Sequence, residues 1–235
     1  IFIYCISLAY NLQLFIINQL KKEKGNYSSY FFNTDQHWKP ATALWGAGEI
    51  SRHLKESFDV DIEMKLFDKN LYFIKKYKNW FLGSLGKRAG KYYAGIDDFD
   101  VFLPKFKTAL IFEADTSQGK IKREGSFQQS MYEWSYIEKK DLFSLNTYAG
   151  YTGGDYGFSR TINKKSKNKY RILLIRDSFS CTLAPFLSLS CERLDTIDMR
   201  HYKGKIEDYI QSENPDIVII AYNPSAFTEK QFKFI

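Results

Sequence analysis

The sequence predicts an α/β fold in which helices cover both faces of a mostly parallel sheet. Three short apolar runs in the last third of the chain are typical of buried strands, and they lie at 171–175, 194–197 and 216–221. Two segments with the pattern of helices separate these runs, at 179–189 and 205–212. An alternation of strands and helices predicts parallel pairing, because each helix carries the chain back to the edge where the previous strand began. Pro185 lies inside the first of these helices and is expected to bend or end it.

The first part of the chain is predicted to hold a helix, a loop and a second helix. Residues 1–20 are apolar but carry four amide side chains, so they differ from the ~20 nearly uninterrupted apolar residues of a membrane helix. We expect buried secondary structure there, helical over 12–22. Residues 30–32 have the pattern of a strand end that leads into a loop at 33–38. Pro40 then fits the first turn of the next helix, where its missing N–H costs nothing.

Residues 58–156 have a different pattern, which we interpret as a β-rich insertion within a single domain spanning 1–235. Alternating polarity indicates short strands at 60–66 and 100–103. Two more strands are predicted around a hairpin turn at 117–119, and they lie at 108–113 and 120–124. The chain begins with Ile rather than Met, so we expect it to be truncated at the N-terminus, with any export signal upstream.

A net charge of +7, from 34 basic and 27 acidic side chains, makes an anionic partner the first hypothesis to examine. The densest basic run is KKSKNK at 164–169, where a surface turn is expected, and no finger, basic helix or aromatic–basic motif accompanies it. We therefore expect no nucleic-acid partner and interpret the charge as a lysine-rich solvated surface that suits an acidic polymer. The three cysteines form no CxxC pair and the histidines form no cluster, so neither a disulfide framework nor a metal or cofactor site is predicted.

Ser178 is the strongest candidate nucleophile. It follows the predicted strand at 171–175 and opens a predicted helix, so its hydroxyl is expected at the carboxyl edge of the sheet, where ligands bind in such folds. The free N–H groups of a helix N-terminus would favour a developing oxyanion. The alternative is that Asp177 or Ser178 only caps the helix.

A nucleophilic serine needs a base, and His37 has the most suitable context of the three histidines. Asp35 lies two residues earlier in an extended stretch, where alternate side chains share a face, so its carboxylate is placed to hold the imidazole tautomer. Trp38 would form a wall of the site. His53 lies on the helix after Pro40 among charged residues, and His201 lies in a loop that also borders the predicted cleft. For Asp35 and His37, the alternative is a surface loop or half of a metal site.

Asn223 ends the strand at 216–221 beside the strand that carries Ser178, so its amide is expected to point over the same edge as a second oxyanion donor. The alternative is an ordinary turn residue before Pro224.

Together these segments resemble the DHHW proteins of bacteria, which are similar in turn to the SGNH-like domains of alginate O-acetyltransferases. The resemblance covers most of 33–223 and rests on four short motifs in a fixed order: DQHW at 35–38, IRDSF at 175–179, IDMRHY at 197–202 and IIAYN at 219–223. The insertion matches more loosely, through YTGGDY at 151–156.

The resemblance implies a flavodoxin-like, SGNH-type sheet that carries a triad of Ser178, His37 and Asp35. Here the Asp-x-His motif precedes the serine, as in the alginate enzymes, and triads occur in several chain orders. Gln36 stands where DHHW proteins have their first histidine, and Arg176 replaces the glycine of Gly-Asp-Ser. The resemblance assigns oxyanion or substrate binding to further residues, namely Asn223, Phe179, Arg200, Tyr202 and Trp38. A structural ion pair is an equal alternative for Arg200.

The leading functional hypothesis is serine-dependent O-acyl transfer, usually of acetyl, or ester hydrolysis on a cell-envelope or extracellular polysaccharide. The expected partners are a hydroxyl-bearing polymer and a membrane-bound acyl-donor protein, and the resemblance implies an extracytoplasmic location. A second hypothesis is a catalytically inactive component that binds glycan or acts in assembly. A nucleotide-binding flavodoxin-like protein is a third, weaker alternative, because no glycine-rich phosphate loop follows any predicted strand.

Overall fold

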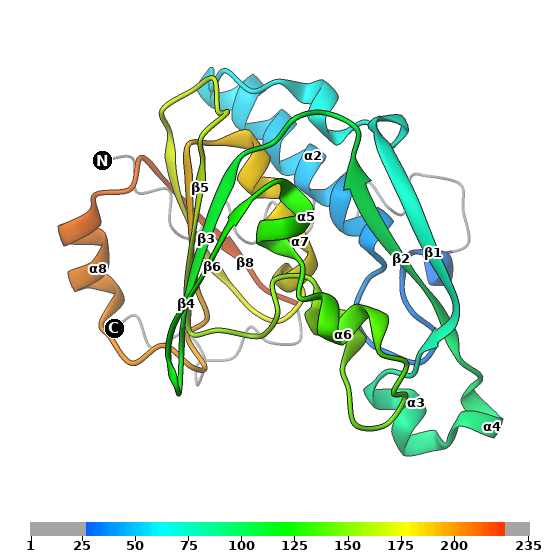
Figure 1. Ribbon diagram of the computed structural model, residues 1–235. Coiled ribbons are helices and arrows are strands. Elements are labelled where there is room, and N and C mark those ends of the chain that lie inside the picture. The colour runs from blue at the N-terminus through cyan, green and yellow to red at the C-terminus, as the bar shows by residue number, and fades with distance from the viewer. Residues whose placement is uncertain (1–26, 224–235) are drawn as a thin grey trace.

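The computed structural model describes residues 27–223, and Figure 1 shows its elements arranged around a twisted central sheet. Within 27–223 this sheet has six strands in the order β4-β3-β5-β7-β6-β8. The strands span Leu110–Thr116 (β3), Gly119–Gly125 (β4), Phe158–Asn163 (β5), Arg171–Arg176 (β6), Arg193–Ile197 (β7) and Ile217–Ala221 (β8). The predicted α/β fold is confirmed, and the three predicted C-terminal strands correspond to β6, β7 and β8.

The pairing of the strands divides the sheet into two halves. β6 pairs in parallel with both β7 and β8, as the alternation of strands and helices predicted. β3, β4 and β5 join the same sheet antiparallel, so the sheet is mixed rather than mostly parallel. The hairpin of β3 and β4 around residues 117–118 accounts for one of these antiparallel pairs, and β5 pairs antiparallel with both β3 and β7.

Helices cover both faces of the parallel half, as predicted (Figure 1). α2 (Pro40–Phe58) and α7 (Ser180–Leu187) pack together on one face, and α8 (Ile206–Glu213) covers the other. Alternate side chains of β6 enter different cores: Ile172 and Leu174 face α2 and α7, whereas Leu173 and Ile175 face α8. Burying each such side chain stabilises the fold by roughly 1.5–3 kcal/mol.

α2 begins at Pro40, as predicted, and ends where Asp59 adopts a left-handed conformation with φ of 54°. Gly48 on this helix has a specific packing role, because a Cβ there would lie 3.0 Å from the Cβ of Phe67. α7 continues through Pro185 and ends at Leu187, where a short 3-10 turn over Ser188–Ser190 follows. The predicted helix over 12–22 lies outside the described residues.

Residues 58–156, which the sequence pattern suggested are an insertion, supply β3 and β4 of the central sheet and also form a second, two-stranded antiparallel sheet made of β1 (Tyr72–Phe81) and β2 (Asp97–Pro104). Short helices connect and flank its strands: α3 (Ser84–Ala89), α4 (Lys91–Ala94), α5 (Phe127–Met131) and α6 (Trp134–Glu138). The strand predicted at 100–103 lies within β2. The strand predicted at 60–66 is wrong, because this segment pairs with no strand among residues 27–223 and ends in a 3-10 turn from Met64.

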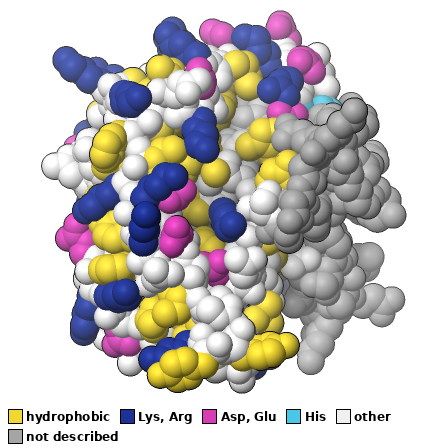
Figure 2. Space-filling view, turned by 90° about the vertical axis from the view of Figure 1, so that its right-hand side faces the viewer, with side chains coloured by type: hydrophobic (Ala, Val, Ile, Leu, Met, Phe, Trp, Pro, Cys, Tyr) yellow, Lys and Arg dark blue, Asp and Glu magenta, His cyan; other side chains and the backbone are white. Residues whose placement is uncertain are grey.

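Surface charge on the insertion side of the molecule is dispersed. Figure 2 shows Lys and Arg side chains scattered over this face among acidic, apolar and uncharged groups. Several large apolar side chains are exposed in the insertion, including Phe73 on β1 and both Tyr92 and Tyr93 on α4. Among residues 27–223, no helix has the length and apolar character needed to cross a membrane.

Candidate active site

Ser178 lies in the turn between β6 and α7, at the carboxyl end of a central parallel strand. The carboxylate of Asp177 accepts the backbone N–H of Phe179 at 3.0 Å and that of Asn223 at 2.7 Å. One side chain therefore fixes the turn that carries Ser178 and ties it to the end of β8. Burial raises the pKa of Asp177, and the two N–H groups partly offset that rise.

His37 and Asp35 meet Ser178 at this edge, although 141 positions separate Ser178 from His37 in the chain. The Oγ of Ser178 lies 2.8 Å from the Nε2 of His37, and the Nδ1 of the same ring is hydrogen-bonded to the Oδ1 of Asp35. The side chains of His37 and Asp35 are only 12% and 6% exposed. These contacts form an unbroken hydrogen-bonded chain from carboxylate to imidazole to hydroxyl, which is the geometry a triad requires.

The carboxylate of Asp35 is held in its ionised form. Burial opposes ionisation, but the hydrogen bond and charge of His37 and the backbone N–H groups of Ser84 and His37 outweigh it. The pKa of Asp35 therefore lies below its ordinary value. Its Oδ2 accepts the N–H of Ser84 at 2.7 Å, so each carboxylate oxygen has its own donor and the group cannot rotate without losing one.

The two-stranded sheet of the insertion supports the loop that carries His37 and Asp35. Asp97, at the start of β2, accepts the backbone N–H and the hydroxyl of Thr34 at 2.8 and 2.7 Å. The N–H of Gly83 in turn donates to the Thr34 hydroxyl at 2.9 Å. A Cβ at Gly83 would overlap the side chain of Asp35, so the absence of a side chain there lets the turn after β1 approach the carboxylate closely.

Aromatic rings enclose the imidazole of His37. Tyr148 stacks on it with ring centroids 4.3 Å apart, and the ring of Phe179 lies at 4.8 Å. Trp38 donates its indole N–H to the carbonyl of Phe179 at 2.9 Å and to the hydroxyl of Thr182 at 3.0 Å. The tyrosine hydroxyl of Tyr148 bonds to the same two groups, so the two aromatic side chains fix the start of α7 against the loop of His37.

Backbone N–H groups near Ser178 differ in their availability for an oxyanion. The N–H of Phe179 donates to Asp177, so this group is already committed and only the ring of Phe179 borders the site. Within residues 27–223, the N–H of Ser178 itself has no acceptor, which leaves it available to a substrate oxygen. Asn223 lies beside the turn through its backbone bond to Asp177, as its position after β8 predicted.

Arg176, the residue that replaces a glycine of the resembling families, is buried beneath this turn. Its guanidinium pairs with Asp155 and, at 3.4 Å, with Asp198, and it donates to the carbonyl of Tyr156 at 2.9 Å. Arg200 bonds to both carboxylates as well, at 2.5 Å to Asp198 and 2.6 Å to Asp155. The two arginines and two aspartates therefore form one charge-balanced cluster, and Arg200 has the structural ion pair that sequence analysis gave as an alternative.

Replacing Arg176 by Met is expected to destabilise the protein by about 3 kcal/mol, because two carboxylates then lose a buried partner. Urea unfolding followed by circular dichroism measures this change. Lys164→Met is the matched control, since Lys164 pairs with Glu124 at 2.6 Å on the surface, where an ion pair is worth about 1 kcal/mol or less. If the two substitutions lowered the free energy of unfolding equally, the structural role of the buried cluster would be contradicted.

The same cluster holds the one group of potential metal ligands found among residues 27–223. Ligand atoms of Asp155, Asp198 and His201 lie within 4.8 Å of one another. Both carboxylates are already neutralised by Arg176 and Arg200, so the cluster does not need a cation to balance its charge.

A cleft of about 640 Å³ opens beside this cluster, at the same end of the sheet as Ser178. Its walls are the β3–β4 turn, the segment before β5 and the loop after β7. Tyr202, one of the predicted substrate-binding residues, lines this cleft together with Tyr156 and Phe158. Aromatic rings beside polar groups are suited to the mixed apolar and hydroxyl surface of a sugar.

Several residues of the site were not found by sequence analysis. Thr34, Asp97 and Ser84 orient the Asp35 loop, and Tyr148 and Thr182 fix the wall around His37. All except Thr34 lie far along the chain from the motif they support, so no local spacing could have shown the contacts. Asp97 stands at the start of an alternating strand, which indicated a strand but not its partner.

The sequence matches no family model and no curated protein, but solved structures resemble the fold. PatB1 from Bacillus cereus, solved with and without a sulfonyl adduct, has a TM-score of 0.73 and 22% identity. The match to the adduct structure covers 93% of this chain and 70% of that chain. A DHHW family protein from Eubacterium siraeum has a TM-score of 0.60 and 16% identity, over 86% of this chain and 61% of that one.

The O-acetyltransferase domain of AlgJ from Pseudomonas putida also matches, over 95% of this chain and 71% of that chain. Its TM-score of 0.37 and identity of 11% are too low to support an inference. The resemblance that the four motifs predicted is thus confirmed at the level of the fold, which this chain shares with PatB1 and the DHHW protein.

Proposed function

We propose that this protein catalyses serine-dependent O-acyl transfer or ester hydrolysis on a polysaccharide. The observation that carries the proposal is the hydrogen-bonded chain from Asp35 through His37 to Ser178. In this arrangement the serine hydroxyl is hydrogen-bonded to an imidazole, and the other imidazole nitrogen is hydrogen-bonded to a buried carboxylate. Nucleophilic catalysis by the serine is the most direct explanation of this arrangement.

In the first half-reaction, His37 takes the proton of Ser178 as the Oγ attacks the acyl carbonyl. Negative charge develops on the carbonyl oxygen, and the backbone N–H of Ser178 and the side-chain NH₂ group of Asn223 are its expected donors. When the tetrahedral intermediate collapses, the leaving oxygen receives the proton from His37, and the acyl group remains as an ester on Ser178.

In the second half-reaction, His37 takes a proton from the acceptor hydroxyl as its oxygen attacks the acyl ester. The bond to Ser178 then breaks, and His37 returns the proton to the Oγ of Ser178. Water as the acceptor gives hydrolysis, and a sugar hydroxyl gives transfer. Asp35, ionised by its surroundings, holds the imidazole with its Nδ1 protonated and stabilises the imidazolium that forms in both steps. The cleft lined by Tyr156 and Tyr202 is the proposed path of the acceptor polymer.

PatB1, whose fold this chain resembles, was solved with a sulfonyl adduct, which makes a sulfonyl reagent a suitable probe of Ser178. The short separation of Ser178 and His37 favours an active enzyme over an inactive glycan-binding component. An extracytoplasmic location and a membrane-bound acyl donor, both implied by the resemblance, belong to the same proposal.

Hydrolysis of p-nitrophenyl acetate tests the proposal with a small acyl donor that needs no partner protein. We expect an initial burst of p-nitrophenol of about one equivalent per chain, followed by slower turnover as the acetyl ester on Ser178 is released. Acid-quenched samples should contain one acetyl group, on the peptide that includes Ser178. A label on any other residue, or steady release without an acetylated chain, would contradict the two-step mechanism.

A further inference from the structure

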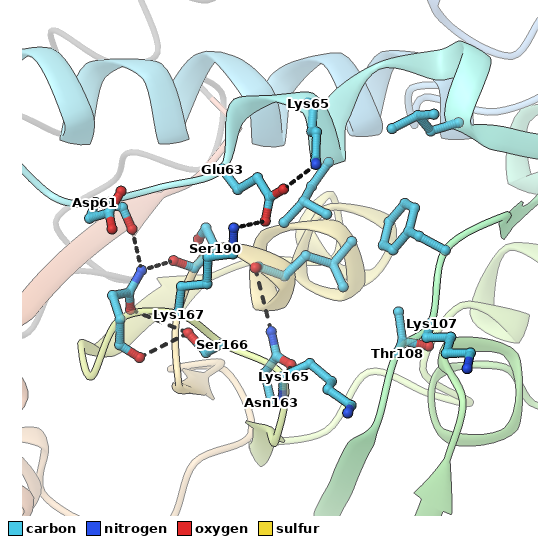
Figure 3. Close-up of a pocket in the computed structure, with 15 residues that line it drawn as sticks. Asp61, Glu63, Lys65, Lys107, Thr108, Asn163, Lys165, Ser166, Lys167 and Ser190 are labelled. Atoms are coloured by element: carbon cyan, nitrogen blue, oxygen red, sulfur yellow. Dashed lines mark hydrogen bonds and ion pairs between the residues drawn. The ribbon is translucent and has the colours of Figure 1, made fainter.

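A polar pocket of about 210 Å³ lies at the opposite end of the central sheet from Ser178 (Figure 3). The turn after β5 and the segment before β3 contribute to its walls, and β6 begins at Arg171 on this side. Ser178 follows the other end of β6, so the pocket and the proposed catalytic site are separated by the length of the sheet.

Lysine side chains from three segments surround this distal pocket. Lys165 and Lys167 come from the basic run at 164–169, and Lys65 and Lys107 come from the insertion. Figure 3 shows Glu63 between two of them, and its carboxylate pairs with Lys65 at 2.5 Å and Lys167 at 3.1 Å. The basic run is therefore one wall of a pocket as well as a solvated turn.

Two of the four lysines have no carboxylate partner within residues 27–223. These are Lys107 and Lys165, whose side chains lie on the same side of the pocket in Figure 3, away from Asp61. Thr108 lies beside Lys107, and its hydroxyl oxygen accepts the N–H of Phe127 at 2.7 Å, so its own proton is free to be donated. This corner offers two ammonium groups and a hydroxyl donor, which suits an anion.

The remainder of the pocket combines polar and apolar groups. Asn163, Ser166, Asn168 and Ser190 line it beside Leu66, Phe106 and Leu189, which are packed into or against the hydrophobic core. The acidic groups that face the pocket are Asp61 and the already paired Glu63, so four lysines against two carboxylates leave the lining net positive. Apolar side chains interspersed with amides and hydroxyls, beside two ammonium groups, match a sugar unit that has C–H and hydroxyl surfaces and carries a charged group.

We propose that this distal pocket binds one charged unit of an anionic glycan strand, with Lys107 and Lys165 contacting its carboxylate or phosphate group. Pockets for drug-sized ligands measure ~300–1,000 Å³, so a volume near 210 Å³ suits a single sugar unit of a longer chain. Such a site would hold a polymer on the protein independently of the triad. The inference goes beyond the proposed acyl chemistry and does not depend on it.

Isothermal titration calorimetry on the Ser178→Ala protein tests this site without any turnover. The two probes are hexagalacturonate, whose sugar units carry carboxylates, and a glucosyl phosphate oligomer of the same charge, at about 0.1 M salt, where charges farther apart than ~10 Å are screened. We expect at least one probe to bind, and the double substitution Lys107→Gln/Lys165→Gln to raise its Kd by about tenfold. The probe that responds identifies the anionic group.

The matched control is Lys78→Gln/Lys139→Gln, which removes the same charge from two exposed lysines outside the pocket. We expect this control to change the Kd by less than twofold. Equal weakening by both pairs would show diffuse charge attraction and overturn the proposal, as would the absence of binding by both probes. Thermal melting of both double variants checks that each remains folded, and their unfolding midpoints should agree with that of the parent protein.

Discussion

Replacing Ser178 by Ala should lower kcat for p-nitrophenyl acetate by about 10⁴- to 10⁶-fold, the range seen when a nucleophile acting within a triad is removed. Without the Oγ, no acyl ester forms, and the remaining N–H donors and cleft contribute only binding and charge stabilisation. The side chain of Ser178 is partly exposed, so its truncation should leave the free energy of unfolding nearly unchanged. The measurement is the steady-state rate, with the burst amplitude recorded in the same experiment.

A second serine–histidine pair provides the control for this substitution. On the surface of α2, outside the site around Ser178, the Oγ of Ser57 lies 3.3 Å from the Nδ1 of His53. Ser57→Ala should therefore retain full activity. If Ser178→Ala and Ser57→Ala hydrolysed the ester at equal rates, the assignment of Ser178 as nucleophile would be wrong.

Asp35→Asn should lower kcat by about 10⁴-fold while leaving the backbone in place. The two oxygens of Asp35 accept from His37 and from the N–H of Ser84, so an amide cannot satisfy both positions. If the NH₂ group of the substituted side chain faces Ser84, it meets the backbone N–H of Ser84, and neither donor has an acceptor there. If it faces His37, it donates to Nδ1 and forces the proton onto Nε2, which then cannot accept the proton of Ser178.

The same substitution has a signature in acid stability. Because the folded-state pKa of Asp35 is lowered, its ionisation stabilises the fold above the unfolded-state pKa of about 3.8, and this contribution is lost as the pH falls through the folded-state pKa. The difference in unfolding free energy between wild type and Asp35→Asn should therefore shrink as the pH drops below about 4. Asp208→Asn, which changes an exposed carboxylate on α8, should preserve activity. Normal turnover by Asp35→Asn would remove Asp35 from the mechanism.

The C-terminal half of the fold was predictable because its signals are local. Each buried parallel strand has apolar residues on both faces, and polar residues mark where β6 and β8 end, at Asp177 and Asn223. Since the carboxyl ends of parallel strands share an edge, Ser178 and Asn223 could be placed together before any coordinates were known. Their motifs also carried the resemblance that placed His37 beside them.

The insertion was less predictable, for physical reasons that particular residues illustrate. Val60 and Ile62 are buried and alternate with polar neighbours, but in the described part of the chain no strand pairs with them, so the sequence pattern of a strand occurs here without a strand. Asp97 and Ser84 gain their roles only through contacts with the Asp35 loop, 49 or more positions away. A sequence shows where apolar and polar residues alternate, but which segment pairs with the backbone of such a stretch depends on the packing of the whole chain.

The central claim is that the Oγ of Ser178, activated by His37, is the nucleophile, and covalent labelling with phenylmethylsulfonyl fluoride tests it most directly. Peptide mass spectrometry should find a single sulfonyl group on Ser178 of the wild-type protein. The label should be absent from Ser178→Ala and should form far more slowly in His37→Ala, where no base accepts the hydroxyl proton. An unlabelled Ser178 in the wild-type protein, or equal labelling in wild type and His37→Ala, would contradict it.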